Sequence, residues 1–331
     1  DEPTNHLDLP AIERIESALL PRVIIENREL ETPTLEQRMS HYAVPGASVV
    51  MIDGGRIDWV RGYGVADEDG RAVTPTTLFQ AASISKPVAA MAALALVDQG
   101  LLDLDADVNE SLTSWRVPAS DFTEKAPVTL RGLLSHTAGL TVHGFPGYGP
   151  DETVPGTIGV LDGEGNTDPV RVDVQPGTIH RYSGGGYTVV QQLIVDVTGA
   201  PFPEAMETLV LEPLGMDHST YQQPLPPELH DEAATAHFSD GRPVEGRFHT
   251  YPEMAAAGLW TTPSDLARFL ISLQQARKTG QHPVLSGEMV DEMLTPVLGD
   301  YALGLGIADG QRFGHGGANA GFRCTMTALL E

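Results

Sequence analysis

Ser83-Ile84-Ser85-Lys86 is the stretch around which the rest of this chain is organised. It follows a short apolar run, residues 78–82, and opens a second apolar run that stops at Gly100. Apolar residues in the second run recur at spacings of three and four, which predicts a buried helix with glycine at its C-cap. Ser83 and Lys86 then lie one turn apart, on the same face of the helix start.

A lysine in that position is expected to lose its proton easily. The start of a helix carries partial positive charge, and burial also disfavours an ammonium, so we expect the pKa of Lys86 to fall. A neutral amine can activate the hydroxyl of Ser83, and N–H groups at the helix end can face a developing oxyanion. A capping serine beside a surface lysine would give the same pattern, so partner motifs are needed.

Composition excludes several classes of partner. The 331 residues include 45 acidic and 20 basic side chains, a net charge of −25 that argues against nucleic acid and anionic membrane surfaces. Cys324 is the single cysteine, so an internal disulfide is impossible, and no apolar stretch is long enough to predict a membrane span. The sequence shows no signal peptide, and it does not predict a compartment.

The order of the expected elements predicts the fold class. Residues 47–52 and 56–60 alternate as two strands around an Asp53-Gly54-Gly55 turn, and residues 301–307, 312–315 and 322–328 alternate again near the other end. The section between them is mostly helical and includes loops rich in Gly, Pro and Asp over residues 141–181. We expect an α+β fold, in which N- and C-terminal strands form one antiparallel sheet flanked by helices, with an inserted helical domain.

Two glycine-rich stretches are candidate partners for Ser83. Tyr182-Ser183-Gly184-Gly185-Gly186-Tyr187 precedes a helix, and a tyrosine near a lysine cation can have a lowered pKa and act as a base. His315-Gly316-Gly317-Ala318 ends a predicted strand, and its glycines leave room for a ligand beside the backbone. A packing tyrosine and an exposed histidine at a hairpin bend are the alternatives.

With these stretches in view, the chain resembles the superfamily of serine β-lactamases and penicillin-binding proteins, on the branch of class C β-lactamases and family VIII carboxylesterases. The resemblance covers about residues 35–331. Four stretches carry it: Phe79-x-x-x-Ser83-x-x-Lys86, Leu134-Ser135-His136-Thr137-Ala138-Gly139-Leu140, Pro176-Gly177-x5-Ser183, and residues 257–266 (AGLWTTPSDL).

The resemblance implies a role for each matching position. Ser83 matches the nucleophile, Lys86 the lysine beside it, and Tyr182 the general base, while His315 begins the third motif. Backbone N–H groups of Ser83 and Ala318 would form the oxyanion hole. The remaining candidates for substrate contact are Gly184, Gly316, Gly317, His143, Tyr148 and Trp260. A literal Lys278-Thr279-Gly280 ends a predicted helix, whereas the family's third motif lies on a strand, so we do not assign it to the site.

Three departures from the family pattern narrow the expected function. Gly184 stands where the family has asparagine, and His315 replaces the lysine of the third motif. A neutral imidazole binds a substrate carboxylate less well than an ammonium, so both changes favour neutral esters over β-lactams. The family also has a further strand and helix after the strand that here reaches Glu331, and an uncovered sheet edge would favour a homo-oligomer.

The predicted function is therefore a serine hydrolase, and the leading prediction is a carboxylesterase that hydrolyses small esters through a Ser83 acyl-enzyme and needs no metal or organic cofactor. A β-lactamase or D-amino-acid peptidase or amidase with the same site, and an inactive penicillin-binding sensor module, remain the alternatives.

The first residues of the chain form a separate case. Asp1-Glu2-Pro3-Thr4-Asn5-His6-Leu7-Asp8 resembles a segment of ABC-type ATPases, but no G-x-x-x-x-G-K-[ST] loop is present to bind a nucleotide. The expected domains are a helical extension over 1–34 with a helix near 8–20, a sheet domain over 35–82 and 251–331, and a helical domain over 83–250. The active site is expected at the interface of the last two.

Overall fold

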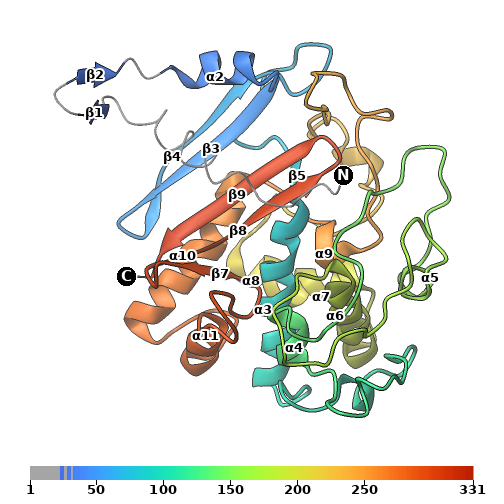
Figure 1. Ribbon diagram of the computed structural model, residues 1–331. Helices are drawn as coiled ribbons and strands as arrows, with labels where there is room; N and C mark the ends of the chain where they lie inside the picture. Colours follow the sequence, from blue (N-terminus) through green and yellow to red (C-terminus); the bar gives the residue numbers. More distant parts are fainter. Residues whose placement is uncertain (1–22, 26–27, 31–32, 331) are drawn as a thin grey trace.

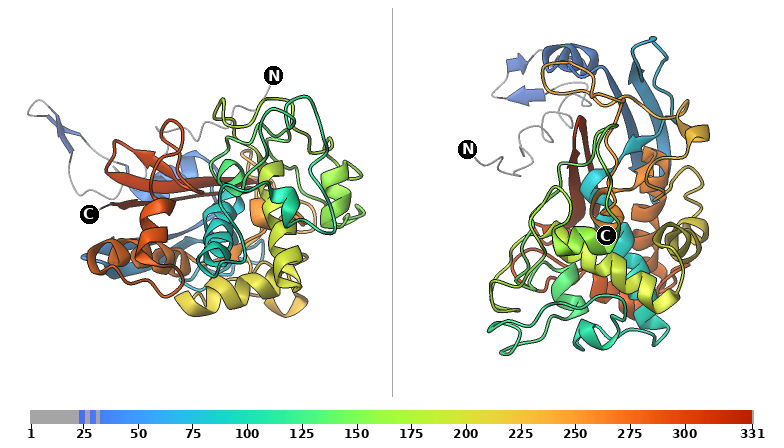
Figure 2. Two further views of the ribbon diagram at one scale, coloured as in Figure 1. Left: turned by 90° about the horizontal axis from the view of Figure 1, so that it is seen from below. Right: turned by 90° about the vertical axis from the view of Figure 1, so that its right-hand side faces the viewer.

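The computed structural model describes residues 23–25, 28–30 and 33–330. Its strands lie on one side of the molecule and most of its helices on the other (Figure 1). The two further views show the same division, with the green and yellow helical segments gathered away from the red strands (Figure 2). The α+β class predicted from the sequence is confirmed.

The first strand pair follows the predicted hairpin. β3 (Gly46–Asp53) and β4 (Arg56–Gly64) are antiparallel, with Asp53 opposite Arg56. The two residues of the turn, Gly54 and Gly55, have φ of +56° and +75°. Glycine adopts these values without a steric penalty, so the Gly-Gly pair fixes the register of the hairpin.

The C-terminal strands form a second, separate antiparallel ladder in the order β7 (Gly306–Ala308), β8 (Arg312–Asn319) and β9 (Phe322–Leu329). The prediction of a strand over 301–307 is mostly wrong, because the side chains of 302, 303 and 305 are all fully buried and Gly304 has φ of +90°. The prediction of one sheet is also wrong for the described residues, since no ladder joins β9 to β3. Helix α10 (Pro263–Thr279) contacts β3, β4 and β9 and packs the two ladders together.

The helix predicted after Ser83 is α3 (Ser85–Asp98), and Gly100 follows its C-cap with φ of +71°. Every side chain from Ser85 to Leu96 is buried, so the helix is enclosed on all sides and does not show a single apolar stripe. It lies against α6 (Gly184–Thr198), α9 (Met254–Ala257) and α11 (Gly287–Met293). One continuous core surrounds α3 and takes residues from both the predicted sheet domain and the predicted helical domain.

The remaining elements are short. They are α2 (Leu35–His41), β5 (Phe79–Gln80), η1 (Ala82–Ile84), η2 (Val108–Glu110), α4 (Leu130–Leu134), α5 (Thr157–Asp162), α7 (Phe202–Met206), η3 (Glu207–Leu211), α8 (Glu212–Leu214), η4 (Pro227–Leu229) and β6 (Trp260–Thr261).

The described part of the N-terminal extension is not helical. β1 (Val23–Ile25) pairs with β2 (Arg28–Leu30), as the β-branched run of β1 favours. The ATPase-like segment and the helix predicted near 8–20 lie outside the described residues. No helix among the described residues has the length and hydropathy to cross a membrane. Self-association through the open edge of β9 stays a prediction.

Candidate active site

The turn that carries Ser83 is held in an unusual conformation. Ser83 is half-buried in η1, directly after Ala82, whose φ is +49°. This left-handed value costs a non-glycine residue on the order of 1 kcal/mol, so the surrounding contacts must enforce it. Ser85 supplies two of them, because its hydroxyl donates to the Ala82 carbonyl and accepts the N–H of Leu259 at 2.9 Å.

Lys86 is buried beside the Ser83 hydroxyl. Its Nζ lies 3.2 Å from Ser83 Oγ and donates to the carbonyl of Ala256, in α9, at 2.7 Å. Burial disfavours the ammonium and lowers the pKa of Lys86 to about 7. The lowered pKa predicted from the sequence is therefore confirmed, and a substantial fraction of the amine is neutral at neutral pH.

Tyr182 completes the group from the start of α6. The Lys86 Nζ lies 4.9 Å from the centre of the Tyr182 ring. Burial raises the pKa of Tyr182, and the neighbouring Ser83 side chain only partly opposes that effect. The prediction that a nearby lysine cation would lower this pKa is wrong, because desolvation of the phenolate outweighs the attraction.

The opposite wall of the site is β8, which packs against η1 through bare backbone. A Cβ at Gly317 would lie 2.3 Å from the Ala81 carbonyl oxygen and 2.6 Å from the sulfur of Cys324. Only glycine allows β8 to approach the Ser83 turn this closely. Asn319 fixes the end of the strand, since its amide donates to Gln80 at 2.8 Å and to the Ala257 carbonyl at 3.0 Å.

His315 on β8 is a neutral residue in this site. Its Nδ1 donates to the Gly316 carbonyl, so Nε2 is the acceptor for the Tyr301 hydroxyl at 3.0 Å. Burial, and to a lesser degree the Lys86 charge, lower the pKa of His315 to about 3. The imidazole therefore supplies no positive charge for a substrate carboxylate.

Comparison with known proteins gives the family. The family model described as Beta-lactamase matches residues 32–331. This chain belongs to the Beta-lactamase family.

Several relatives of this Beta-lactamase-family chain are known by sequence. Esterase EstB of Burkholderia gladioli is 33% identical over 193 residues, which are 55% of this chain and 48% of that protein. Protein flp of Staphylococcus aureus (strain N315) is 26% identical, covering 70% and 44%, and unguisins hydrolase ungD' of Aspergillus campestris is 28% identical, covering 56% and 35%. The chain thus spans about half or less of the length of these relatives.

Two solved structures share the fold. The octameric penicillin-binding protein homologue from Pyrococcus abyssi superposes with a TM-score of 0.75 at 24% identity, over 89% of this chain and 69% of that one. A penicillin-binding protein from Bacillus halodurans gives a TM-score of 0.70 at 20% identity, over 90% and 91%.

Position 184, where the family has asparagine, leaves no room for a side chain in this chain of the Beta-lactamase family. A Cβ on Gly184 would lie 2.8 Å from the ring of Phe145 and 3.1 Å from the carbonyl oxygen of His143. Phe145 therefore occupies the space that a longer side chain at 184 would need. Glycine here is required by the packing of the loop over residues 141–147, and the missing amide is replaced by an apolar ring.

Two of the predicted substrate contacts are wrong, and one lies beside the site. Trp260 is fully buried in a second core cluster, with edge-on contacts to Phe248 and Phe322 at 4.7 and 5.8 Å, because β6 is enclosed. Tyr148 is 4% exposed, and its hydroxyl accepts the N–H of Asn166 at 3.0 Å, so it braces the long loop from inside. His143 is exposed, with its ring 5.1 Å from that of Tyr182.

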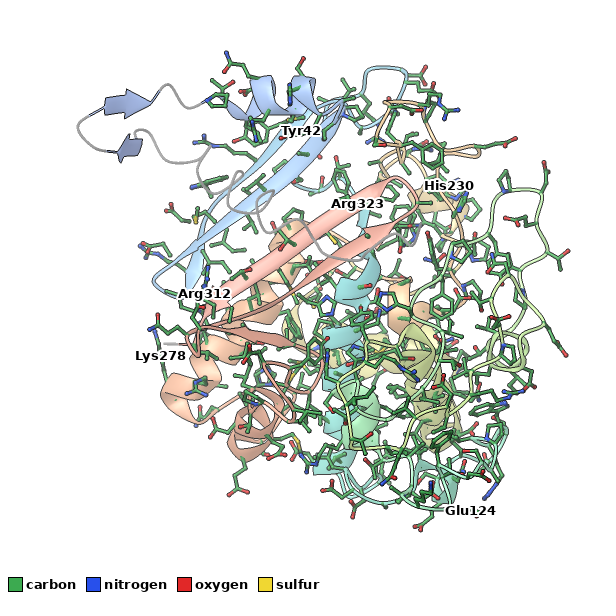
Figure 3. All side chains as sticks on the ribbon, in the orientation of Figure 1. Tyr42, Glu124, His230, Lys278, Arg312 and Arg323 are labelled. Carbon is green, nitrogen blue, oxygen red and sulfur yellow. The ribbon has the colours of Figure 1, made fainter. Side chains whose placement is uncertain are left out.

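Other observations define the limits of the site. Lys278 is an exposed residue at the end of α10 and lies at the periphery of the molecule (Figure 3), as expected for a chance Lys-Thr-Gly. No three His, Cys, Asp or Glu side chains in the described ranges are placed to hold a metal ion. The sequence did not indicate the group of aromatic rings near Tyr182, which comprises the buried His136 and Tyr187, the half-buried Tyr301 and the exposed His180. His136, His180 and Tyr187 lie in stretches that the sequence singled out, but the contacts between their rings exist only after folding.

Proposed function

We propose that this chain is a serine hydrolase that cleaves small, neutral carboxylic esters through an acyl-enzyme on Ser83. The observation that carries the proposal is the buried Lys86 amine, which has a pKa of about 7 and lies 3.2 Å from Ser83 Oγ. An unprotonated amine at that distance is a competent base for a serine hydroxyl.

The mechanism assigns the protons differently from the family-based expectation. Ser83 Oγ attacks the ester carbonyl while its proton passes to the neutral Lys86 amine. The carbonyl oxygen becomes an oxyanion held by the backbone N–H groups of Ser83 and Ala318. Tyr182, whose pKa is raised by burial, stays protonated and donates to the leaving alkoxide, taking a proton back from Lys86. Water, deprotonated by the same amine, then attacks the acyl-enzyme, and Lys86 returns that proton to Ser83 Oγ as the bond to the acyl group breaks and the acid leaves.

The walls of the site support an ester over a β-lactam or peptide substrate. His315 is neutral and provides no cation for the carboxylate of such molecules. Phe145 fills the space where an amide side chain would contact an amide substrate. The names of two relatives, esterase EstB and unguisins hydrolase ungD', agree with hydrolysis as the reaction.

Replacement of the nucleophile tests the proposal. Ser83→Ala is expected to lower turnover of p-nitrophenyl butyrate by about 1,000-fold or more, because no other group can form the acyl-enzyme. Intact-mass analysis of the unchanged protein after mixing with a phosphonate ester should show one adduct, which Ser83→Ala lacks. Ser40→Ala, on the exposed face of α2, is the matched control and should behave like the unchanged protein.

Two outcomes would overturn the assignment. Full ester turnover by folded Ser83→Ala would remove Ser83 from the chemistry. Nitrocefin turnover as fast as ester turnover would show that an amide is the preferred substrate class.

A further inference from the structure

We propose that His136 is a positioning residue that holds the Tyr182 phenol against Ser83 and Lys86. The inference rests on the proposed function, since it assumes that Tyr182 moves protons during ester cleavage. Three contacts join His136 to the ring of Tyr182 and to the backbone N–H groups of the residues on either side of Tyr182.

Two of these contacts fix the backbone. The N–H of Arg181 donates to the His136 carbonyl at 2.8 Å, and the N–H of Ser183 donates to His136 Nδ1 at 3.1 Å. The residues before and after Tyr182 are thus hydrogen-bonded to the same residue, through the peptide group between His180 and Arg181 and the one that follows Tyr182. These bonds hold the chain on both sides of Tyr182 and so fix the direction in which its side chain leaves the backbone.

The third contact fixes the ring. The centres of the His136 and Tyr182 rings are 4.1 Å apart with an interplanar angle of 37°, and His136 is only 2% exposed. A stack this close leaves the phenol little freedom to swing away from Ser83. On its exposed side, Tyr182 has the His143 ring at 5.1 Å, a looser contact from a solvent-accessible residue.

The backbone of His136 is adapted to this arrangement. Its φ is +60°, a value that is uncommon for residues other than glycine but that histidine, asparagine and aspartate adopt more often than the rest. The two residues that follow, Thr137 and Ala138, both donate to the Gly132 carbonyl and lock the turn after α4. In this conformation, the carbonyl and the ring of His136 both reach the chain around Tyr182. This uncommon backbone conformation therefore lies at a residue that adjoins the site.

His136 acts through Tyr182 and not as a proton carrier. Because Nδ1 accepts the N–H of Ser183, the imidazole carries its proton on Nε2, which has no partner among the described residues. Burial and the charge of Lys86 hold the pKa of His136 well below its ordinary value, so the ring is neutral. A neutral ring adds no positive charge that would further depress the pKa of Lys86.

Two variants separate the contacts. His136→Gly keeps the left-handed backbone and loses both side-chain contacts, whereas His136→Asn tolerates the same φ and offers an amide oxygen to Ser183. For p-nitrophenyl butyrate we expect kcat to fall about 30-fold in His136→Gly and less in His136→Asn, with KM changed by less than about twofold. His41→Asn, which alters a surface histidine that packs on Tyr42 at 4.8 Å, is the matched control and should keep full activity.

A double-mutant cycle distinguishes the positioning role of His136 from a merely structural role. In a Tyr182→Phe background, His136→Gly should lower kcat by less than about threefold further, because its effect passes through the phenol hydroxyl. Rates are expressed per active site, counted by phosphonate titration, so that unfolded protein does not lower the measured kcat. Should His136→Gly fail to fold, the same cycle is run with His136→Asn.

The outcomes distinguish this inference from the proposed function. Additive losses in the cycle, or wild-type kcat in both His136 variants while Tyr182→Phe is impaired, would overturn the positioning role alone. Wild-type kcat in Tyr182→Phe would overturn the role of the phenol and, with it, the role of His136. Ser83→Ala with full activity would overturn the proposed function itself.

Discussion

The start of α3 and the start of α9 each bury one ionisable side chain, and they differ in what surrounds it. Lys86 in α3 has Ser83 Oγ at 3.2 Å and the carbonyl of Ala256, in α9, at 2.7 Å. Glu253, the residue before α9, is fully buried, and neither of its carboxylate oxygens has a hydrogen-bond partner in the described part of the chain.

Burial shifts the pKa of both side chains, but only the shift at Lys86 serves the proposed reaction. Burial brings the pKa of Lys86 down to about 7 and that of Glu253 up to about 7. At Lys86 the cost of burial yields a neutral amine beside a nucleophile. At Glu253 neither carboxylate oxygen has a hydrogen-bond partner among the described residues, so burial should affect only stability. A shifted pKa therefore indicates function when oriented partners accompany it.

The largest expected effect is the loss of the amine. Lys86→Met should lower kcat/KM for p-nitrophenyl butyrate by about 1,000-fold or more, since the base is removed. The free energy of unfolding should not fall, because an uncharged chain of similar length suits the buried position. Lys278→Met, on the surface at the end of α10, is the control and should change neither quantity. An active Lys86→Met would remove the distinction between the two groups.

The next effect concerns Glu253 and stability. Between its ordinary pKa of 4.5 and about 7, the native state binds a proton that the unfolded state lacks, so stability falls as pH rises through that range. Glu253→Gln imitates the protonated form and should raise the free energy of unfolding by up to about 3 kcal/mol at pH 8, with little gain at pH 4. Urea unfolding at both pH values measures this. An equal gain at the two would show that the carboxylate is not the source.

The smallest effect sharpens the comparison through the pH dependence of the reaction. The active form of Lys86 is neutral, so kcat/KM should rise about tenfold per pH unit below pH 7 and level off above it. Glu253→Gln should leave that profile in place, because burial alone lowers the pKa of Lys86. A profile displaced by half a unit or more in Glu253→Gln would show that the two buried groups are coupled.

The parts of the fold that depend on local sequence were predictable. Gly54 and Gly55 specify their turn by conformation alone, and the spacing of Ser83 and Lys86 along one helical turn brings their side chains together without tertiary information. Alternation gave the wrong element at residues 301–305, where the side chains of Ala302, Leu303 and Leu305 are all fully buried and Gly304 has a positive φ.

The rest of the site depends on contacts between distant segments. The raised pKa of Tyr182 follows from burial by residues far away in sequence, so proximity to a lysine could not predict its direction. Tyr148 and Trp260 lie in segments whose composition fits a core as well as a pocket wall. His136 was visible as part of a motif, but its contacts with Arg181 and Ser183 exist only after folding.

The close approach at Gly317 has a consequence for how such a site can diverge. Main chain meets main chain there, so any side chain at position 317 would push β8 away from η1. Few substitutions on the β8 wall of the site can therefore change which substrates it accepts. The loop bearing His143 and Phe145 contacts Tyr182 and Gly184 through side chains, and it is therefore the adjustable half, where laboratory evolution of acyl preference should concentrate its libraries.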